Sequence, residues 1–261
     1  MISNKKIIVG NWKMNLDTHG ASLYLHKLSG LIKVHNDVEI VLAPTVLTLQ
    51  SLSLQIDSKQ FKLASQNFYW RDHGAFTGEV SATQLRGIVQ YALVGHSERR
   101  YIFNESEKDL RNKIAAAIRN NIRPILCIGE TAWERSNGET IDVLRDQLTC
   151  GLANVTSEDL KDVIIAYEPV WAVGTGDNAM PNDVKLAIHA IRLEIEHLYG
   201  TRAAKSIQVL YGGSVTVANV GDYLSLSELN GLVIGTESLN AYTFSEIVKK
   251  AHKGSKLAKK D

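Results

Sequence analysis

The chain has 261 residues, of which 44% are hydrophobic and 22% are charged, and its formal net charge at pH 7 is +1. This composition is ordinary for a globular protein, and a charge so close to zero excludes a global field that would attract nucleic acid or an anionic membrane. An anionic ligand would therefore have to be bound by a local arrangement of side chains and backbone groups.

Short apolar runs alternate with longer amphipathic segments from one end of the chain to the other. The runs that predict buried strands cover residues 7–9, 38–43, 61–65, 92–94, 124–128, 163–167, 207–211 and 232–234. Apolar residues at helical spacing predict helices between them, over 21–34, 110–118, 141–152 and 183–199. Strands that alternate with helices form right-handed βαβ units, and a closed barrel of eight units takes about 250 residues. We therefore predict a single α/β domain over residues 1–252, folded as a (β/α)8 barrel, and a basic, disordered tail over residues 253–261.

Residues 67–78 depart from this alternation because they have no helical period. They include Phe68, Tyr69, Trp70 and Phe76 together with two glycines. A long aromatic loop that its own barrel cannot bury is a candidate subunit interface. A loop that folds back on its own surface is the alternative, and we favour the interface.

The spacing of the cysteines and the length of the apolar segments indicate the cellular compartment of the protein. Cys127 and Cys150 have neither CxxC nor metal-site spacing, which suits a reducing compartment, and Cys127 lies in an apolar run that predicts burial. The run 7–9 is too short for a signal-peptide core, and no stretch approaches a membrane span. We expect a cytoplasmic protein with no membrane or nucleic-acid partner.

The run that ends near residue 167 leads into the most distinctive motif of the chain. Glu168 follows the run directly, and Pro169 ends the strand because it cannot donate a hydrogen bond to a sheet. Gly174 and Gly176 follow in a loop of small residues and can adopt positive φ. A carboxylate held at a strand end beside a hinged loop is what a general base under a lid requires, whereas an ordinary strand end and turn is the alternative.

Residues that follow the carboxyl ends of the strands share one rim of a barrel, where active sites form. Asn11 and Lys13 follow the first predicted strand, His96 the fourth and Glu168 the sixth. Without a set of metal ligands, these residue types suggest proton transfer next to a carbonyl group. Glu168 would remove a carbon-bound proton, and His96 would polarise the carbonyl as a neutral donor, because it lies where a helix begins and the positive helix end disfavours imidazolium. Lys13 and Asn11 would stabilise the charge of the enediolate, so that neither a metal nor a cofactor is expected.

Glycine-rich turns follow the seventh and eighth predicted strands, at residues 212–214 and 235–236. Barrels often bind phosphate at these two turns through backbone N–H groups and a helix N-terminus. Ser214 could cap the next helix, and a plain tight turn with a cap is the alternative. Lys13 across the mouth would supply positive charge, so the sequence predicts a small phosphorylated substrate.

Taken together, these motifs are similar to those of the triosephosphate isomerase family over about residues 10–239. The matching segments are GNWKMN at 10–15, GAFTGE at 74–79, VGHSERR at 94–100, CIGE at 127–130, AYEPVWAVGTG at 166–176 and YGGSV at 211–215. The resemblance implies the TIM-barrel fold and a cofactor-free interconversion of dihydroxyacetone phosphate and D-glyceraldehyde 3-phosphate through an enediolate, in glycolysis and gluconeogenesis. It also implies a homodimer in which Thr77 reaches into the partner's site near Asn11.

The resemblance also implies a role for each matching site residue. The implied catalytic residues, with Glu168 as base and His96 as electrophile, are Asn11, Lys13, His96 and Glu168. Asn11 and Lys13 would also contact the substrate, and its phosphate would be held by the lid and the two glycine-rich turns, at Gly174, Ser214, Gly235 and Thr236. Glu98 would contact Lys13, and Tyr211 would help to latch the lid.

The chain departs from the family pattern in three places. Thr236 stands where the family usually has glycine; a β-branched residue would be strained at positive φ, so we predict negative φ with the amide still available to phosphate. Asn104 stands where glycine is common, which affects a turn rather than the chemistry. Asp177 and Asn178 replace a hinge pair that is often Lys-Thr, and we expect altered lid kinetics with the same reaction.

Two rival functions fit parts of the pattern. An isomerase of a four-carbon ketose phosphate would share the chemistry with a different pocket floor. A non-catalytic phosphate-binding barrel would need neither Glu168 nor His96. The intact motifs favour the three-carbon substrate.

Overall fold

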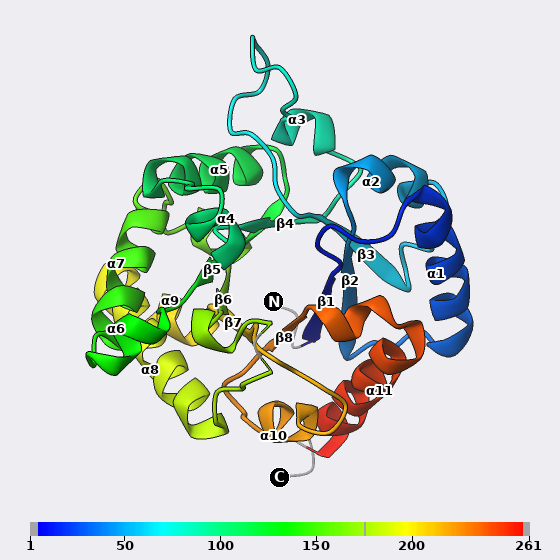
Figure 1. Ribbon diagram of the computed structural model, residues 1–261. Helices are drawn as coiled ribbons and strands as arrows, with labels where there is room; N and C mark the ends of the chain where they lie inside the picture. Colours follow the sequence, from blue (N-terminus) through cyan, green and yellow to red (C-terminus); the bar gives the residue numbers. More distant parts are fainter. Residues whose placement is uncertain (1–4, 175, 258–261) are drawn as a thin grey trace.

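The computed structural model describes residues 5–174 and 176–257, and in these ranges eight parallel strands close into a barrel in chain order (Figure 1). The strands are β1 Lys6–Asn11, β2 Val38–Ala43, β3 Phe61–Ser65, β4 Tyr91–Val94, β5 Arg123–Ile128, β6 Ile164–Tyr167, β7 Gln208–Tyr211 and β8 Gly231–Ile234. Each strand pairs with the next, and β8 pairs with β1 to complete the ring. The predicted (β/α)8 fold is confirmed.

The strands are largely apolar because both faces of the sheet are buried. Along β1, Ile7 and Val9 belong to a cluster inside the barrel, whereas Ile8 packs in the larger cluster between the strands and the helices. Cys127 lies in the inner cluster, as its apolar setting predicts. A parallel sheet covered on both sides is encoded by continuous apolar runs instead of alternation. This is why the strands stand out in the sequence.

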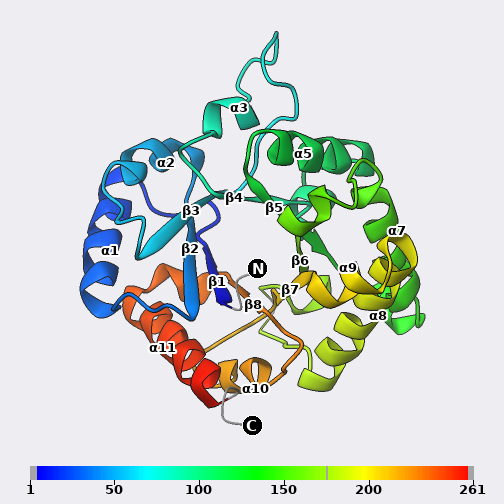
Figure 2. The same cartoon turned by 180° about the vertical axis from the view of Figure 1, so that it is seen from behind.

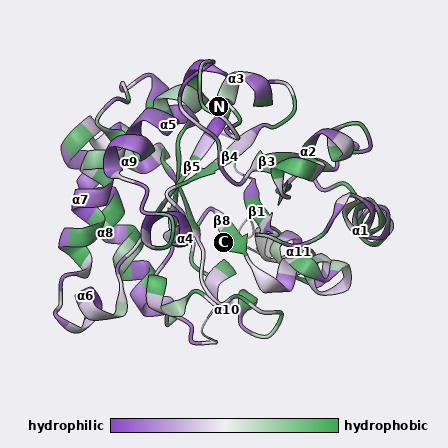
Figure 3. Ribbon diagram, turned by 45° about the horizontal axis from the view of Figure 1, so that its top comes forward, coloured by the Kyte–Doolittle hydropathy of each residue, from purple (hydrophilic) through white to green (hydrophobic). Residues whose placement is uncertain are grey.

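The helices surround the strands on the outside of the ring (Figures 1 and 2). Their bounds are α1 Thr18–Leu31, α2 Val46–Ser53, α3 Ala82–Leu85, α4 Ser97–Tyr101, α5 Glu107–Arg119, α6 Ala132–Ser136, α7 Thr140–Leu152, α8 Pro181–Tyr199, α9 Thr201–Ser206, α10 Val220–Leu224 and α11 Ala241–Leu257. Three short 3₁₀ helices are η1 Asp159–Asp162, η2 Val170–Ala172 and η3 Thr236–Leu239. The strands are largely hydrophobic and the outer helices mix polar and apolar residues (Figure 3), as expected for helices that bury one side. None of the helices in the described ranges is long and apolar enough to cross a bilayer.

Every predicted strand is found, with its ends displaced by no more than two residues. The helix predicted over 21–34 is displaced, because it begins at Thr18 and ends at Leu31. Asp17 caps it by accepting a hydrogen bond from the amide of Gly20, and Ile32 has an extended backbone that ends it. The apolar pattern therefore placed this helix about three residues too late.

Two parts of the chain lie apart from the regular alternation. The loop between β3 and α3, which contains residues 67–78, projects beyond the ring of helices (Figures 1 and 2). Within it the Tyr69 ring packs against Phe76 and Trp70, with ring centroids 4.6 and 5.3 Å apart, while Phe68 is buried. At the other end, α11 crosses the domain boundary expected at residue 252 and continues to Leu257, and the remainder of the expected tail lies outside the described residues.

Candidate active site

A cavity of about 450 Å³ opens at the carboxyl ends of the barrel strands. The residues expected to act in catalysis or to hold phosphate all line it, namely Asn11, Lys13, His96, Glu168, Gly174, Ser214, Gly235 and Thr236. They are brought together because parallel strands in a closed barrel end at one rim, although the residues are spread over more than two hundred positions of the chain. The structure thus unites the predicted catalytic group and the predicted phosphate-binding group in one site.

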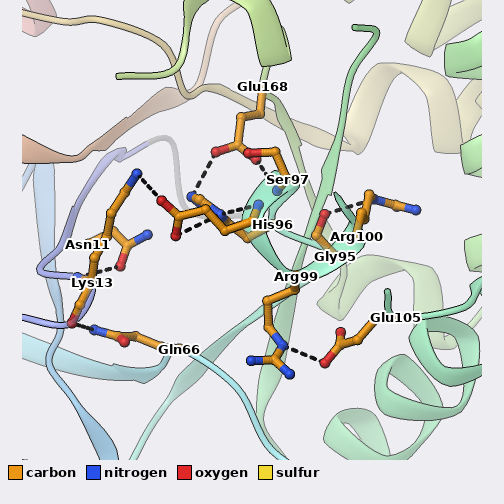
Figure 4. Close-up of polar contacts among 11 residues, drawn as sticks. Asn11, Lys13, Gln66, Gly95, His96, Ser97, Arg99, Arg100, Glu105 and Glu168 are labelled. Atoms are coloured by element: carbon orange, nitrogen blue, oxygen red, sulfur yellow. Dashed lines mark hydrogen bonds and ion pairs between the residues drawn. The ribbon is translucent and has the colours of Figure 1, made fainter. Parts of the chain in front are cut away.

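Glu168 is buried at the end of β6. Its backbone N–H donates to the carbonyl of Ile128 at 2.7 Å, which continues the pairing with β5. Its carboxylate contacts two groups of the β4–α4 turn: Oε1 lies 2.8 Å from His96 Nε2, and Oε2 accepts a hydrogen bond from the Ser97 amide at 2.9 Å (Figure 4). The rigid strand therefore aims a buried carboxylate at the histidine.

Gly129 makes this placement of Glu168 possible. A Cβ atom at Gly129 would lie 2.1 Å from the carbonyl oxygen of Glu168 and 2.6 Å from its carbonyl carbon. The neighbouring backbone leaves no room for a side chain, so the close approach of the two strand ends requires glycine.

His96 is the N-cap residue of α4, in agreement with the helix start expected there. Its Nδ1 accepts a hydrogen bond from the amide of Glu98 at 3.3 Å, and an accepting Nδ1 carries no proton. The proton of a neutral ring is then on Nε2, where it points at Glu168. The geometry therefore fits the neutral donor expected from the sequence.

While the two side chains touch, each shifts the pKa of the other toward its charged form. Burial lowers the pKa of His96, but the adjacent carboxylate of Glu168 outweighs it and holds that pKa above its ordinary value. Burial raises the pKa of Glu168, but His96, the Ser97 amide and Lys13 together hold it below its ordinary value. Glu168 is consequently an ionised carboxylate in this arrangement.

Lys13 and Asn11 lie at the end of β1 and line the same cavity as Glu168. The ammonium group of Lys13 lies 2.7 Å from Oε1 of Glu98, as expected, and the Lys13 amide donates to Asn11 Oδ1 at 3.1 Å (Figure 4). Lys13 has a φ of 50°, a left-handed conformation that costs a non-glycine residue about 1 to 3 kcal/mol. Gln66 secures this backbone, because its side-chain amide donates to the carbonyls of Lys13 at 2.9 Å and Ala43 at 2.8 Å.

The turn after β7 lines the cavity and contacts the lid. A Cβ at Gly213 would lie 2.1 Å from the Tyr211 hydroxyl oxygen, so only glycine fits there. The cap expected of Ser214 is wrong, because the next helix, α10, begins only at Val220. The Ser214 hydroxyl instead donates to the carbonyl of Ala172, at the start of the lid, at 2.8 Å.

The lid itself runs from η2 to the start of α8, and Thr175 in its middle lies outside the described residues. Gly174 and Gly176 have φ of 70° and 88°, which agrees with the freedom inferred for them. At one end Trp171 Nε1 donates to Glu130 Oε1 at 2.8 Å. At the other end the Ala179 amide donates to the Tyr211 hydroxyl at 3.3 Å, so Tyr211 lies where it can hold the lid.

The departures from the family pattern have local explanations. Thr236 has negative φ, as predicted, because it opens the 3₁₀ helix η3; the use of its amide for phosphate stays a prediction. Asn104 has a φ of 52°, and asparagine is one of the few non-glycine residues that readily adopt this conformation. Asn178 lines the cavity, and its side-chain amide donates to the Tyr223 hydroxyl at 3.2 Å.

Sequence reasoning missed two polar residues of the site. Gln66 directly follows β3, so the strand-end rule could have found it. Glu237 lines the cavity beside Thr236 and directly follows the turn after β8. The strand-end rule reaches its position, but a carboxylate is not a residue type that indicates phosphate binding.

Comparison with known proteins gives a consistent result over nearly the whole chain. A family model described as triosephosphate isomerase matches residues 6–251. A triosephosphate isomerase of Chloroherpeton thalassium is 42% identical over 250 residues, which cover 95% of this chain and 99% of that protein. Those of Alkaliphilus metalliredigens and Caldanaerobacter subterraneus are 38% and 39% identical over 245 residues, which cover 94% of this chain and 98% of each relative. The chain therefore belongs to the triosephosphate isomerase family.

Proposed function

We propose that the cavity interconverts dihydroxyacetone phosphate and D-glyceraldehyde 3-phosphate by proton transfer through an enediolate, with no cofactor. The observation that carries the proposal is the contact of the Glu168 carboxylate with His96 Nε2 inside a cavity that also contains Lys13. A base, a hydrogen-bond donor and a cation around one small volume are what the abstraction of a proton next to a carbonyl requires.

Glu168 is the base in this proposal. Without substrate, its carboxylate is held by His96 and by the Ser97 amide, and both contacts lower its basicity. A substrate carbonyl that accepts the Nε2 proton of His96 would displace the carboxylate oxygen from the ring. The carboxylate would then be left buried with fewer donors, and desolvation would strengthen it as a base next to the substrate carbon.

His96 acts as a neutral electrophile. The same displacement removes the main cause of its raised pKa, because the carboxylate leaves the ring and burial then favours the uncharged form. With Nδ1 accepting from the Glu98 amide, Nε2 is the donor to the substrate oxygen. Lys13, whose ammonium group is positioned by Glu98, and Asn11 stabilise the negative charge that develops there.

The phosphate group would be held within the same cavity, next to Lys13 and Glu168. The proposed contacts come from the lid and the turns after β7 and β8, at Gly174, Ser214, Gly235 and Thr236. The bond from Ser214 to Ala172 supports this arrangement, because it couples one of these turns to the lid. A lid that closes over the phosphate would exclude water and hinder loss of phosphate from the enediolate.

We also propose that the protein forms a homodimer through the rim at β1 to β4. Large apolar side chains follow these neighbouring strands and are exposed in the single chain: Met14 is 93% exposed, Leu47 77%, Ile102 67% and Phe103 61%. The loop 67–78, which includes Thr77, follows β3 and projects beyond the ring of helices (Figure 1). Exposed apolar side chains after neighbouring strands, together with a projecting loop, are typical of a subunit interface, and this interface would bring Thr77 close to the partner's Asn11.

A cytoplasmic location belongs to the same proposal. Cys127 and Cys150 are both free thiols, and Cys150 is exposed. A reducing compartment maintains such thiols, which supports the location inferred from the sequence.

A coupled assay on the purified protein without added metal tests the function. We expect turnover of dihydroxyacetone phosphate and glyceraldehyde 3-phosphate, with a lower kcat/KM for a four-carbon ketose phosphate. Glu168→Gln keeps the size of the side chain but removes the base, so kcat should fall about 10² to 10⁴-fold while affinity for inorganic phosphate is retained. Full turnover by this variant would contradict the assignment of the base, and a higher kcat/KM for the four-carbon sugar would contradict the substrate.

A further inference from the structure

Two histidines and an aspartate meet at the end of the barrel opposite the active-site cavity. His35 and Asp37 lie in the connection between α1 and β2, and His252 lies on α11, 215 residues after Asp37. Nδ1 of His252 lies 2.7 Å from Oδ1 of Asp37, and the rings of His35 and His252 are stacked with centroids 3.8 Å apart. One ligand atom from each of the three side chains lies within 4.8 Å of the other two.

We propose that His35, Asp37 and His252 bind a transition-metal dication of the zinc class and thereby fasten α11 to the start of β2. Two imidazoles and one carboxylate are a donor set that zinc, cobalt(II) and nickel accept readily. Magnesium and calcium prefer oxygen donors alone, so they do not match it. Water would complete a tetrahedral shell around the ion.

The spacing of the donors suits such an ion after a small movement of side chains. Donors about 2.1 Å from a tetrahedral zinc lie roughly 3.4 Å from one another, which falls between the 2.7 Å contact and the 4.8 Å limit of this cluster. Stacked rings, here 19° from parallel, keep their nitrogen lone pairs in two nearly parallel planes, so one ring must tilt for both to share the ion. The torsion that tilts an imidazole is soft, and all three residues are only partly buried, which leaves room for the tilt and a path for the ion.

The backbone beneath the donors is already in place. The carbonyl of Asp37 accepts the Lys6 amide at 2.9 Å, and the next residue, Val38, is paired with Lys6 at the start of the β1–β2 ladder. On α11, Val248 and Ala251 are buried in the core next to His252. The metal would therefore order side chains only, which favours binding.

The site spans the seam at which the barrel closes. β8 pairs with β1 there, and α11 packs against α1 and β2 (Figure 2). An ion that binds the folded chain alone stabilises it by mass action, and this ion would hold the last helix to the first half of the barrel. Because the active-site cavity lies at the other end, the metal should change stability and leave turnover unchanged.

Zinc titration of the chelator-treated full chain, followed by calorimetry, tests the proposal. We expect the unchanged protein to bind one equivalent of zinc that His35→Phe does not bind. This variant keeps an aromatic ring against His252 but removes the donor atom. Zinc at one hundred times its dissociation constant should raise the Tm of the unchanged protein by at least about 5 °C. Cobalt(II) at the site should show the intense visible bands of a tetrahedral complex, and these bands too should be absent in His35→Phe.

The matched control is His26→Phe, which removes an exposed histidine on α1 and should bind zinc like the unchanged protein. Asp37→Asn keeps a hydrogen-bonding side chain but loses the anionic donor, so it should weaken zinc binding at least about tenfold; it also carries the test if His35→Phe fails to fold. Isomerase activity should be the same in all these variants. The proposal is overturned if the unchanged protein takes up no zinc, or if both His35→Phe and Asp37→Asn bind it as the control does.

Discussion

The two ends of the barrel strands are built differently, although the same strands reach both. At the carboxyl ends, Lys13 has a left-handed backbone and Glu168 and His96 are buried polar groups that touch each other. At the amino ends, side chains complete the hydrogen bonding of the strands. Asn230 accepts a hydrogen bond from the Val209 amide at 2.8 Å, and Gln90 accepts one from the Leu63 amide at 3.1 Å. The comparison indicates that the buried Glu168–His96 pair and the left-handed Lys13 lie at the active-site end, whereas side chains that complete the hydrogen bonding of the strands lie at the opposite end.

Substituting alanine for one glycine at each end of the barrel should give the largest effects and should separate the roles of the two ends. Gly129, after β5, and Gly231, at the start of β8, both face backbone: a Cβ would lie 2.1 Å from the Glu168 carbonyl oxygen in one case and 1.9 Å from the Ile7 carbonyl oxygen in the other. Each change to alanine should destabilise the fold by about 1 to 3 kcal/mol or more, because backbone has to move. Only Gly129→Ala displaces the base, so only it should also lower kcat of the folded protein, by about 10²-fold. Urea unfolding and active-site-normalised turnover separate the two effects, and equal loss of turnover in both would refute the division of roles.

The lid hinge allows a gentler test. Asn178 donates to Tyr223, and Asp177 precedes it at the end of the lid. Replacing both, as Asp177→Lys with Asn178→Thr, removes this bond without touching Glu168 or His96, so we expect kcat to change about threefold while the substrate preference stays the same. Steady-state kinetics at several solvent viscosities would reveal the altered lid step. Identical kinetics in the unchanged protein and the double variant would show that Asp177 and Asn178 do not affect the lid step.

The dependence of stability on pH is the finest probe of the active-site end. The folded pKa of Glu168 lies below its ordinary value of 4.5, so its contribution is present above that pH and is lost as pH falls through the folded pKa. The folded pKa of His96 lies above its ordinary value of 6.5, so its contribution is present below that pH and is lost as pH rises through the folded pKa. The free energy of unfolding of the unchanged protein, relative to Glu168→Gln, should therefore be greatest between about pH 4.5 and 6.5. Urea unfolding from pH 4 to pH 9 measures it, and a flat difference would mean that the two side chains are not paired in solution.

Much of this organisation could be predicted because the physics behind it is local. Both faces of each strand are buried, which leaves a continuous apolar run, and parallel strands bring whatever follows them to one rim. Pro169 marked the strand end after Glu168, and glycines at 174 and 176 marked the lid. The start of α1 at Thr18 could not be predicted from its apolar period. The N-cap at Asp17, rather than the buried face, decides where this helix begins.

Contacts between distant segments could not be predicted in this way. The bonds from Gln66 to Lys13 and Ala43, the bond from Ser214 to Ala172, and the meeting of His35 and Asp37 with His252 join positions that no periodicity connects. They depend on the register and closure of the barrel, which set the distances between neighbouring loops.

By itself, the sequence determined the order of strands and helices, the closed parallel barrel and the membership of the rim, because burial and backbone geometry act along the chain. Only the tertiary structure decided the left-handed backbone of Lys13, the pairing of Glu168 with both His96 and the Ser97 amide, and the donor cluster at the opposite end. A short-range pattern specifies which face of a segment is buried, whereas the partner of a polar atom is decided by the whole set of packed elements around it.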